Sequence, residues 1–194
     1  KYDGAVKKDH PQTVLKVLAQ ISGKAEKERA YGHLLKAQVA QLDWLSQLSR
    51  DSILVVAERL KSCGDAAERK GDLVLAAVYQ SVMGKMYTRY RYAFDDAKEL
   101  GAEYFRRSME HPEALAAAYC TSYVPFVEDG VDSKYYYDDM LHIIGIAAGD
   151  YRGMHDYYAA HGKREGACLT ALQMVKHKHR NAQGTRVKKS KYIM

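Results

Sequence analysis

Three carboxylates lie within the five residues Asp95-Asp96-Ala97-Lys98-Glu99. Hard cations such as Mg²⁺ bind clustered carboxylates, and an Asp-rich segment of this kind can hold a Mg²⁺–diphosphate substrate. Such an enzyme needs a second acidic cluster that faces the first across a deep apolar cavity, and the sequence shows no convincing one. The sequence therefore favours a capped, charge-rich first turn of a helix, where the helix dipole stabilises acidic residues.

Two other segments contain residue types that bind metals. On a helix, Asp138 and Asp139 lie four and three residues before His142, so the three could supply two metal ligands or a local hydrogen bond that holds the helix. No third ligand is evident, and we favour the local hydrogen bond. His177 and His179 would diverge on a helix, which favours an exposed basic segment over a chelating pair.

Tyrosines and cysteines are the remaining candidates for binding or nucleophilic chemistry. The tyrosines could stack on a ligand or on single-stranded nucleic acid, but the basic residues lie mostly elsewhere in the sequence, so we expect most tyrosines to pack between helices and a few to line a concave peptide-binding face. The cysteines are widely spaced among small or apolar residues, which predicts buried free thiols. The clustered tyrosines are Tyr87, Tyr90, Tyr92 and Tyr135 to Tyr137, six of the sixteen in the chain, and the cysteines are Cys63, Cys120 and Cys168.

No local catalytic signature is present: the sequence contains no GxSxG, HExxH, P-loop or GxGxxG motif. We therefore predict that the chain is not an enzyme, with no catalytic residue, cofactor-binding residue or metal ligand.

The hydrophobic pattern predicts an all-α fold, an antiparallel array of roughly nine helices similar to tetratricopeptide repeats. The segment Met83-Gly84-Lys85-Met86-Tyr87 matches the Leu-Gly-x-x-Tyr core of those repeats, in which glycine allows a partner helix to approach closely. Pro125 to Ser133 is the longest irregular stretch. Helix starts and breaks are expected at Asp9-His10-Pro11, Ala30 to Gly32, Ser49 or Asp51, Gly71-Asp72, Asp95 or Asp96, His111-Pro112, Ser133, Gly149 and Gly162.

Composition predicts one helical domain over residues 1–180 and a basic C-terminal extension over 181–194. The net charge is +6, and the segment from Lys176 to Lys191 alone carries seven Lys or Arg and no acid, so the rest of the chain is close to balanced. This distribution argues against a specific nucleic-acid binder. No apolar run approaches the about 20 residues of a membrane span. The chain begins at Lys1 and ends at Met194 within a pattern, so we expect it to be cut from a longer protein.

A series of short motifs resembles the helical N-terminal region of the very large α2-macroglobulin-like proteins of Bacteroidetes bacteria. The resemblance covers nearly the whole chain. The motifs are His10-Pro11-Gln12-Thr13, Lys24-Ala25-Glu26-Lys27-Glu28, Ala30-Tyr31-Gly32-His33-Leu34-Leu35-Lys36-Ala37, Leu75-Ala76-Ala77-Val78-Tyr79, Gly84-Lys85-Met86-Tyr87, Tyr104-Phe105-Arg106-Arg107-Ser108, His111-Pro112-Glu113, Asp138-Asp139-Met140-Leu141 and His155-Asp156-Tyr157-Tyr158.

The resemblance implies export to the cell envelope. Macroglobulins trap proteases, and many use a Cys-Gly-Glu-Gln thioester, a motif that follows none of the three cysteines here. We therefore expect a non-catalytic interaction or spacer module that contacts other domains of its own polypeptide or a protein partner. The alternative is an intracellular adaptor that binds a peptide on its concave face.

Overall fold

The chain folds into an array of antiparallel α-helices. The computed structural model describes residues 11–127 and 137–190, with side chains described as far as residue 181, and these residues form nine α-helices and no strand. The helices are α2 (Pro11–Glu28), α3 (Tyr31–Ser46), α4 (Arg50–Arg69), α5 (Leu73–Arg89), α6 (Ala97–Ser108), α7 (Pro112–Ala117), α8 (Met140–Ala148), α9 (Tyr151–Ala160) and α10 (Arg164–Ser190), with 3₁₀ turns η1 (Arg91–Ala93) and η2 (Cys120–Tyr123).

Local capping residues set many of the boundaries. Ser49 accepts a hydrogen bond from the Ser52 amide at 3.2 Å at the start of α4, and Asp72 accepts one from the Leu75 amide at 3.1 Å at the start of α5. Each bond satisfies an amide that the first helical turn leaves without a partner. Gly149 and Gly162 end α8 and α9 with φ of +75° and +67°, a conformation that favours glycine.

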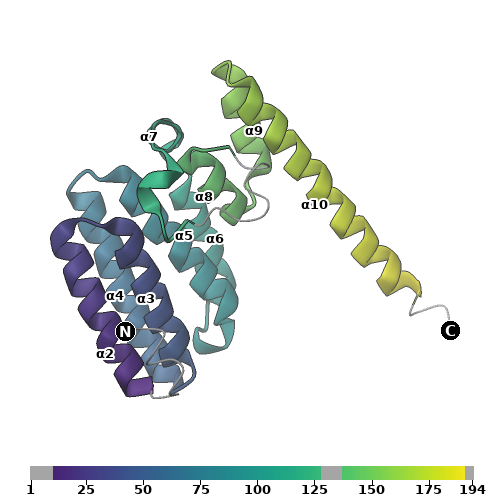
Figure 1. Cartoon of the computed structure of the whole chain (residues 1–194). Helices are drawn as coiled ribbons and strands as arrows, with labels where there is room; N and C mark the ends of the chain where they lie inside the picture. The colour runs from purple at the N-terminus through teal and green to yellow at the C-terminus, as the bar shows by residue number, and fades with distance from the viewer. Residues whose placement is uncertain (1–10, 128–136, 191–194) are drawn as a thin grey trace.

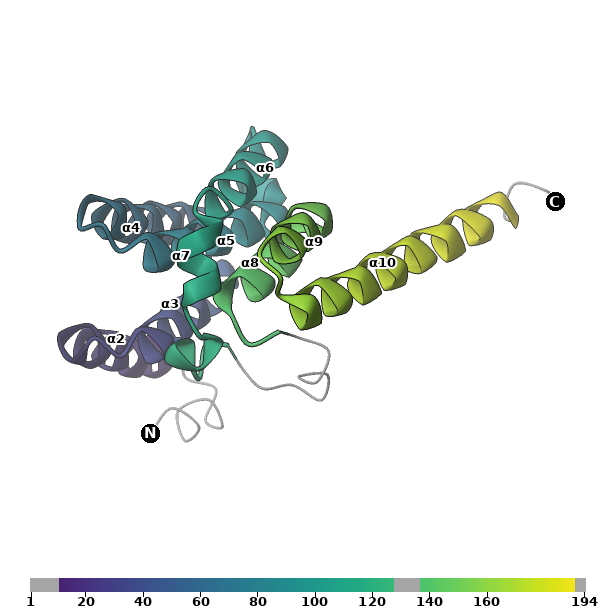
Figure 2. The same cartoon turned by 90° about the horizontal axis from the view of Figure 1, so that it is seen from above.

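Helix α5 is the centre of the molecule. It packs against α4 on one side and α6 on the other, and it also contacts α8 (Figure 1). Twelve of its 17 residues are buried, so it is enclosed on nearly every face. Helices α2 and α3 form a pair that contacts α4 through α3 (Figure 2), and α10 packs against α9 before it projects away from the helical body. Within the described residues, no helix is long and apolar enough to cross a membrane.

The predicted close contact at Gly84 is confirmed. Gly84 is buried, and a Cβ atom placed there would lie 2.8 Å from the Phe105 ring of α6. The side chain of Tyr87, one turn later, packs beside Phe94 and Tyr104 with ring centroids 4.6 and 5.6 Å away. The two residues of the repeat-like motif therefore join α5 to α6.

The expected start of the first closing helix is wrong. Ser133 lies outside the described residues, but residues 137–139 are not helical and α8 begins at Met140. Backbone hydrogen bonds from Cys120 to Asp138 and from Met140 to Ala118, each 2.9 Å, hold this segment against residues 118–120, and Asp139 is extended. At the other end, α10 is one continuous helix that passes through residue 180, where the sequence suggested an extension.

Candidate functional site

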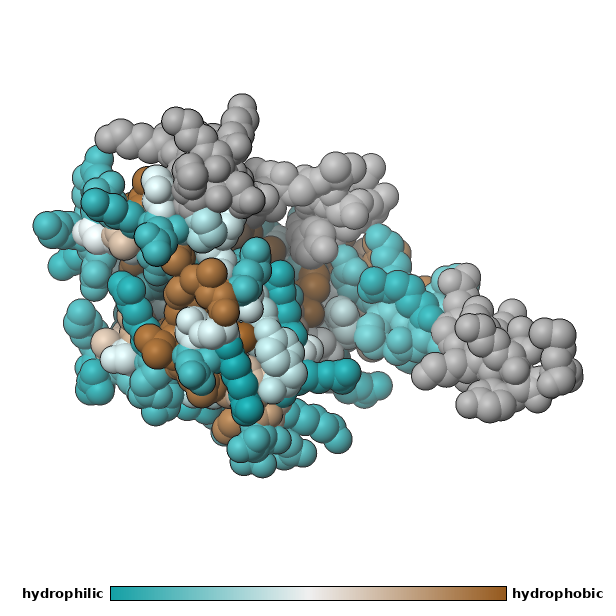
Figure 3. Space-filling view, turned by 90° about the horizontal axis from the view of Figure 1, so that it is seen from below, coloured by the Kyte–Doolittle hydropathy of each residue, from teal (hydrophilic) through white to brown (hydrophobic). Residues whose placement is uncertain are grey.

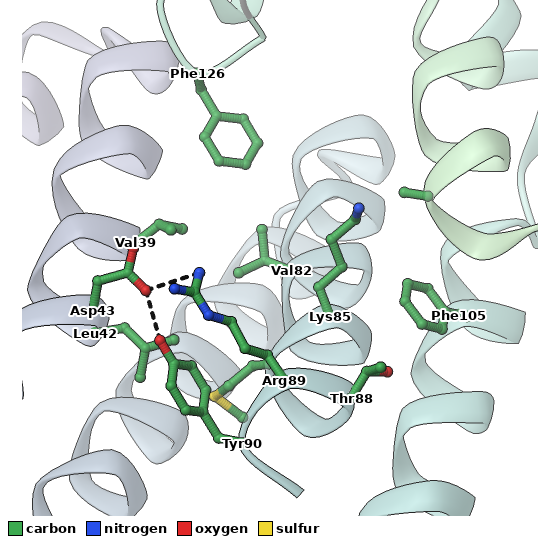
Figure 4. Close-up of a pocket in the computed structure, with 12 residues that line it drawn as sticks. Val39, Leu42, Asp43, Val82, Lys85, Thr88, Arg89, Tyr90, Phe105 and Phe126 are labelled. Carbon is green, nitrogen blue, oxygen red and sulfur yellow. Dashed lines mark hydrogen bonds and ion pairs between the residues drawn. The ribbon is translucent and has the colours of Figure 1, made fainter. Parts of the chain in front are cut away.

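A groove lies between α3, α5 and α8. Helix α4 packs against both α3 and α5, and residues of these two helices line the same space. Phe126, from the segment after η2 (Figure 4), and Ala147 of α8 also line this space. Helices α3, α5 and α8 therefore form a concave surface. The sequence predicted a helical array with one concave face.

The groove consists of two adjoining cavities, of about 480 and about 230 Å³. Apolar side chains form most of the lining. Both cavities are lined by Val82, Lys85, Phe126 and Ala147. The larger cavity also contacts Val39, Leu42, Asp43, Met86, Thr88, Arg89, Tyr90 and Phe105, and the smaller one Val78, Ser81, Val127, Met140, Ile143, Ile144 and Ile146.

Two cations line the groove, and their surroundings differ. Arg89 lies 3.1 Å from the Asp43 carboxylate, which also accepts a 2.6 Å hydrogen bond from the Tyr90 hydroxyl. The exposed side chain of Lys85 points away from that group (Figure 4), and within the described part of the chain no carboxylate forms an ion pair with it. The charge of Arg89 is therefore balanced inside the protein, and that of Lys85 faces the groove.

A second apolar surface lies at one end of the helical body. Figure 3 shows hydrophobic side chains gathered on the face seen from below, with hydrophilic ones around them. Because neighbouring helices are antiparallel, this end brings together the end of α3, the start of α4 and the turn after α5. The large apolar side chains exposed on these segments are Leu48, Leu54, Val55 and Tyr92.

The acidic segment at the start of α6 lies exposed on the surface. The Asp95 side chain is fully exposed and lies 3.9 Å from Arg50. Asp96 occupies the N-cap position without a side-chain capping bond, and Glu99 lies exposed in the first turn. Nowhere in the described residues do three Asp, Glu, His or Cys side chains gather in a way that could hold a metal ion.

Asp139 has the local role that we favoured, together with a tertiary one. Its carboxylate accepts a hydrogen bond from the His142 amide at 2.9 Å and therefore caps α8. It also accepts a 2.6 Å hydrogen bond from the Tyr158 hydroxyl of α9 and lies 3.6 Å from the Lys163 ammonium, which donates to the Ala116 carbonyl. This cluster joins α7, α8 and α9. Asp138, by contrast, is exposed.

Burial shifts the acid–base behaviour of this region. The Asp139 side chain is almost completely buried, and desolvation raises its carboxyl pKa although Tyr158, the His142 amide and Lys163 lower it. Burial also lowers the pKa of the His142 imidazole to about 4. His142 is therefore neutral at physiological pH.

The tyrosines mostly pack between helices, as predicted. Tyr87 and Tyr90 are buried, and Tyr137 packs edge-on to Tyr158 with ring centroids 5.3 Å apart. Tyr92 is exposed. Tyr135 and Tyr136 lie outside the described residues.

The prediction of three buried thiols is wrong. Cys63 and Cys120 are partly buried, and Cys168 is exposed. Helix α10 packs through the face that contains Gly166 and Thr170, so Cys168 lies on the outer face. His177 and His179 are exposed on the same helix, as expected of a basic segment.

No local pattern in the sequence indicates the groove. The motif around Gly84 contains Lys85, but Asp43, Phe126 and Ala147 carry no local signal, because α3, the segment after η2 and α8 come together only in the folded chain.

No protein-family model matches the chain, and neither a curated protein nor a solved structure matches it.

Proposed function

We propose that this chain is a non-catalytic interaction module that binds one segment of a partner protein in the groove between α3, α5 and α8. The supporting observation is the pair of adjoining apolar cavities, which share Val82, Phe126 and Ala147. A concave apolar surface with a few polar groups is typical of a binding site. The non-catalytic character rests on the sequence, in which no catalytic motif was found.

The biological setting that we propose rests on the sequence resemblance. In that setting the chain is an N-terminal module of a cell-envelope α2-macroglobulin-like protein, and its partner is another domain of the same polypeptide or a separate protein. Any protease-trapping chemistry would belong to other domains.

The test uses peptides selected from a random display library on the immobilised chain. Ala147→Arg should weaken binding of the selected peptides at least about tenfold, because a large cation would fill the place where the two cavities meet. Ala148→Arg is the matched control, since Ala148 lines neither cavity. Selected peptides that bind Ala147→Arg as well as they bind the unmodified chain would contradict the proposal.

A further inference from the structure

We propose that the groove selects a segment in which one acidic side chain lies between apolar ones, and that Lys85 binds its carboxylate. This inference rests on the proposed function and names the chemistry of the partner. It follows from the position of Lys85 and from the charges around it.

Lys85 lies where the two cavities adjoin. It lines both of them, together with the apolar side chains of Val82, Phe126 and Ala147. A segment that filled both cavities would pass over Lys85 and place apolar side chains on either side of it. The group of the partner nearest Lys85 therefore lies in the middle of the bound segment.

The other polar groups of the larger cavity already have partners inside the protein. Arg89 and Tyr90 both contact the Asp43 carboxylate, and the Thr88 hydroxyl donates to the Gly84 carbonyl at 2.9 Å. Lys85 has no ion-pair partner among the residues that the structure describes. Lys85 is therefore the cation that is available to a ligand in this part of the molecule.

Covering Lys85 with a wholly apolar segment is unfavourable, because the ammonium loses water and gains no partner. A carboxylate from the bound segment restores a partner, and a basic side chain at the same place is repelled. The surrounding apolar walls strengthen either effect by lowering the local dielectric constant. The charge of the partner side chain nearest Lys85 therefore determines which of several segments of similar shape binds most tightly.

The experiment repeats the peptide selection on three proteins: the unmodified chain, Lys85→Glu and Lys61→Glu. Lys61→Glu is the matched control, because this exposed lysine of α4 lines neither cavity and the substitution changes the net charge equally. Thermal unfolding first checks that all three are folded. Binding is then measured for synthetic peptides from each selection, with the central acidic residue and with its amide counterpart.

The unmodified chain and Lys61→Glu should both enrich peptides with one Asp or Glu between apolar residues. Lys85→Glu should instead enrich Lys or Arg at that position. Replacing the central Glu by Gln should weaken binding to the unmodified chain about threefold to tenfold at low salt, and less as salt rises.

The possible results separate this inference from the proposed function. Peptides that depend on Ala147 but show no preference for acid, or an acid preference that survives Lys85→Glu, would overturn the role of Lys85 and leave the groove intact. Peptides that bind independently of Ala147 would overturn both. If Lys61→Glu abolished the acid preference as fully as Lys85→Glu does, the preference would come from the overall charge of +6, and the role of Lys85 would be overturned.

Discussion

Helices α4, α5 and α6 are joined by apolar packing around α5, whereas α8 and α9 are joined around one buried carboxylate, that of Asp139. Both regions use glycine for close approach: Gly84 faces Phe105 in the first, and Gly145 faces Met154 in the second. In the second region, however, Asp139 also caps α8 and contacts Tyr158 and Lys163. Apolar packing depends little on pH, but a buried polar cluster depends on the charge of each member.

Removal of the Asp139 carboxylate tests the polar cluster and should have the largest effect. Asp139→Ala removes the α8 cap and leaves the buried Tyr158 hydroxyl without its acceptor, so the free energy of unfolding should fall by about 3 kcal/mol. Asp150→Ala is the matched control, because the exposed Asp150 carboxylate caps α9 through the Gly153 amide. We expect about 1 kcal/mol for that loss alone. Equal effects in denaturant titrations would show that Asp139 acts only as a cap.

Enlargement of Gly84 tests the apolar region. Gly84→Leu should cost ~1–3 kcal/mol, because the new side chain must displace the Phe105 ring. Gly23→Leu is the control: Gly23 is exposed in α2, and a Cβ atom there meets nothing within 4 Å. This control should keep or slightly raise the stability, because leucine has the higher helix propensity. An unchanged denaturation midpoint for Gly84→Leu would contradict the α5–α6 contact.

Acid should destabilise the second region through His142. Its pKa is about 4 in the folded protein, below the 6.5 of a free imidazole, so the folded state binds fewer protons than the unfolded state. Above pH 6.5, His142 is neutral in both states and the free energy of unfolding is unaffected by it. As the pH falls from 6.5 to 4, the unfolded state takes up a proton that the folded state does not, and the free energy of unfolding falls. Between about pH 7 and about pH 4.5 this loss amounts to about 2 kcal/mol.

In the variant His142→Gln, the free energy of unfolding should no longer show the fall that protonation of His142 causes between pH 6.5 and 4. The raised pKa of Asp139 acts in the opposite direction, since its contribution to stability falls as the pH rises through the folded value. The pH profile of each variant is therefore compared with that of the unmodified chain. His155→Gln, at a partly buried histidine of α9, is the matched variant for the loss of an imidazole elsewhere. A His142→Gln profile parallel to that of the unmodified chain would contradict the role of His142.

Truncation of α10 should have the smallest effect. Removing the residues after Arg180 should shift the melting temperature by no more than about 2 °C, because the side chains from His177 to Asn181 are exposed. Removal of all residues after Lys163 should lower the melting temperature clearly, because Thr170 and Gln173 are buried.

The basic segment should bind short DNA and RNA weakly, and this binding should weaken further as the salt concentration rises. Tight, sequence-dependent binding at near-physiological salt would contradict the proposed interaction module.

The candidate site was only partly predictable. The sequence pointed to the Gly84 motif and to a concave face, and the structure places Lys85 of that motif in a groove. The residues that line the groove are spread along the sequence from Val39 to Ala147, and the segments that carry them share no motif. The acidic segment at Asp95 drew attention because its carboxylates are adjacent in sequence. In the folded chain they lie at an exposed helix start.

The sequence by itself determined the helical class of the fold, the turns at Gly149 and Gly162, the cap at Asp72, and a helix start at Ser49 or Asp51. These features depend on hydrogen bonds and backbone conformations within about four residues, so the residue types alone specify them. Tertiary structure decided that Asp139 meets Tyr158, that Cys168 faces outward and that Lys85 lines a groove. Each depends on how separate helices pack, and that packing is set by the burial of apolar faces across the whole chain.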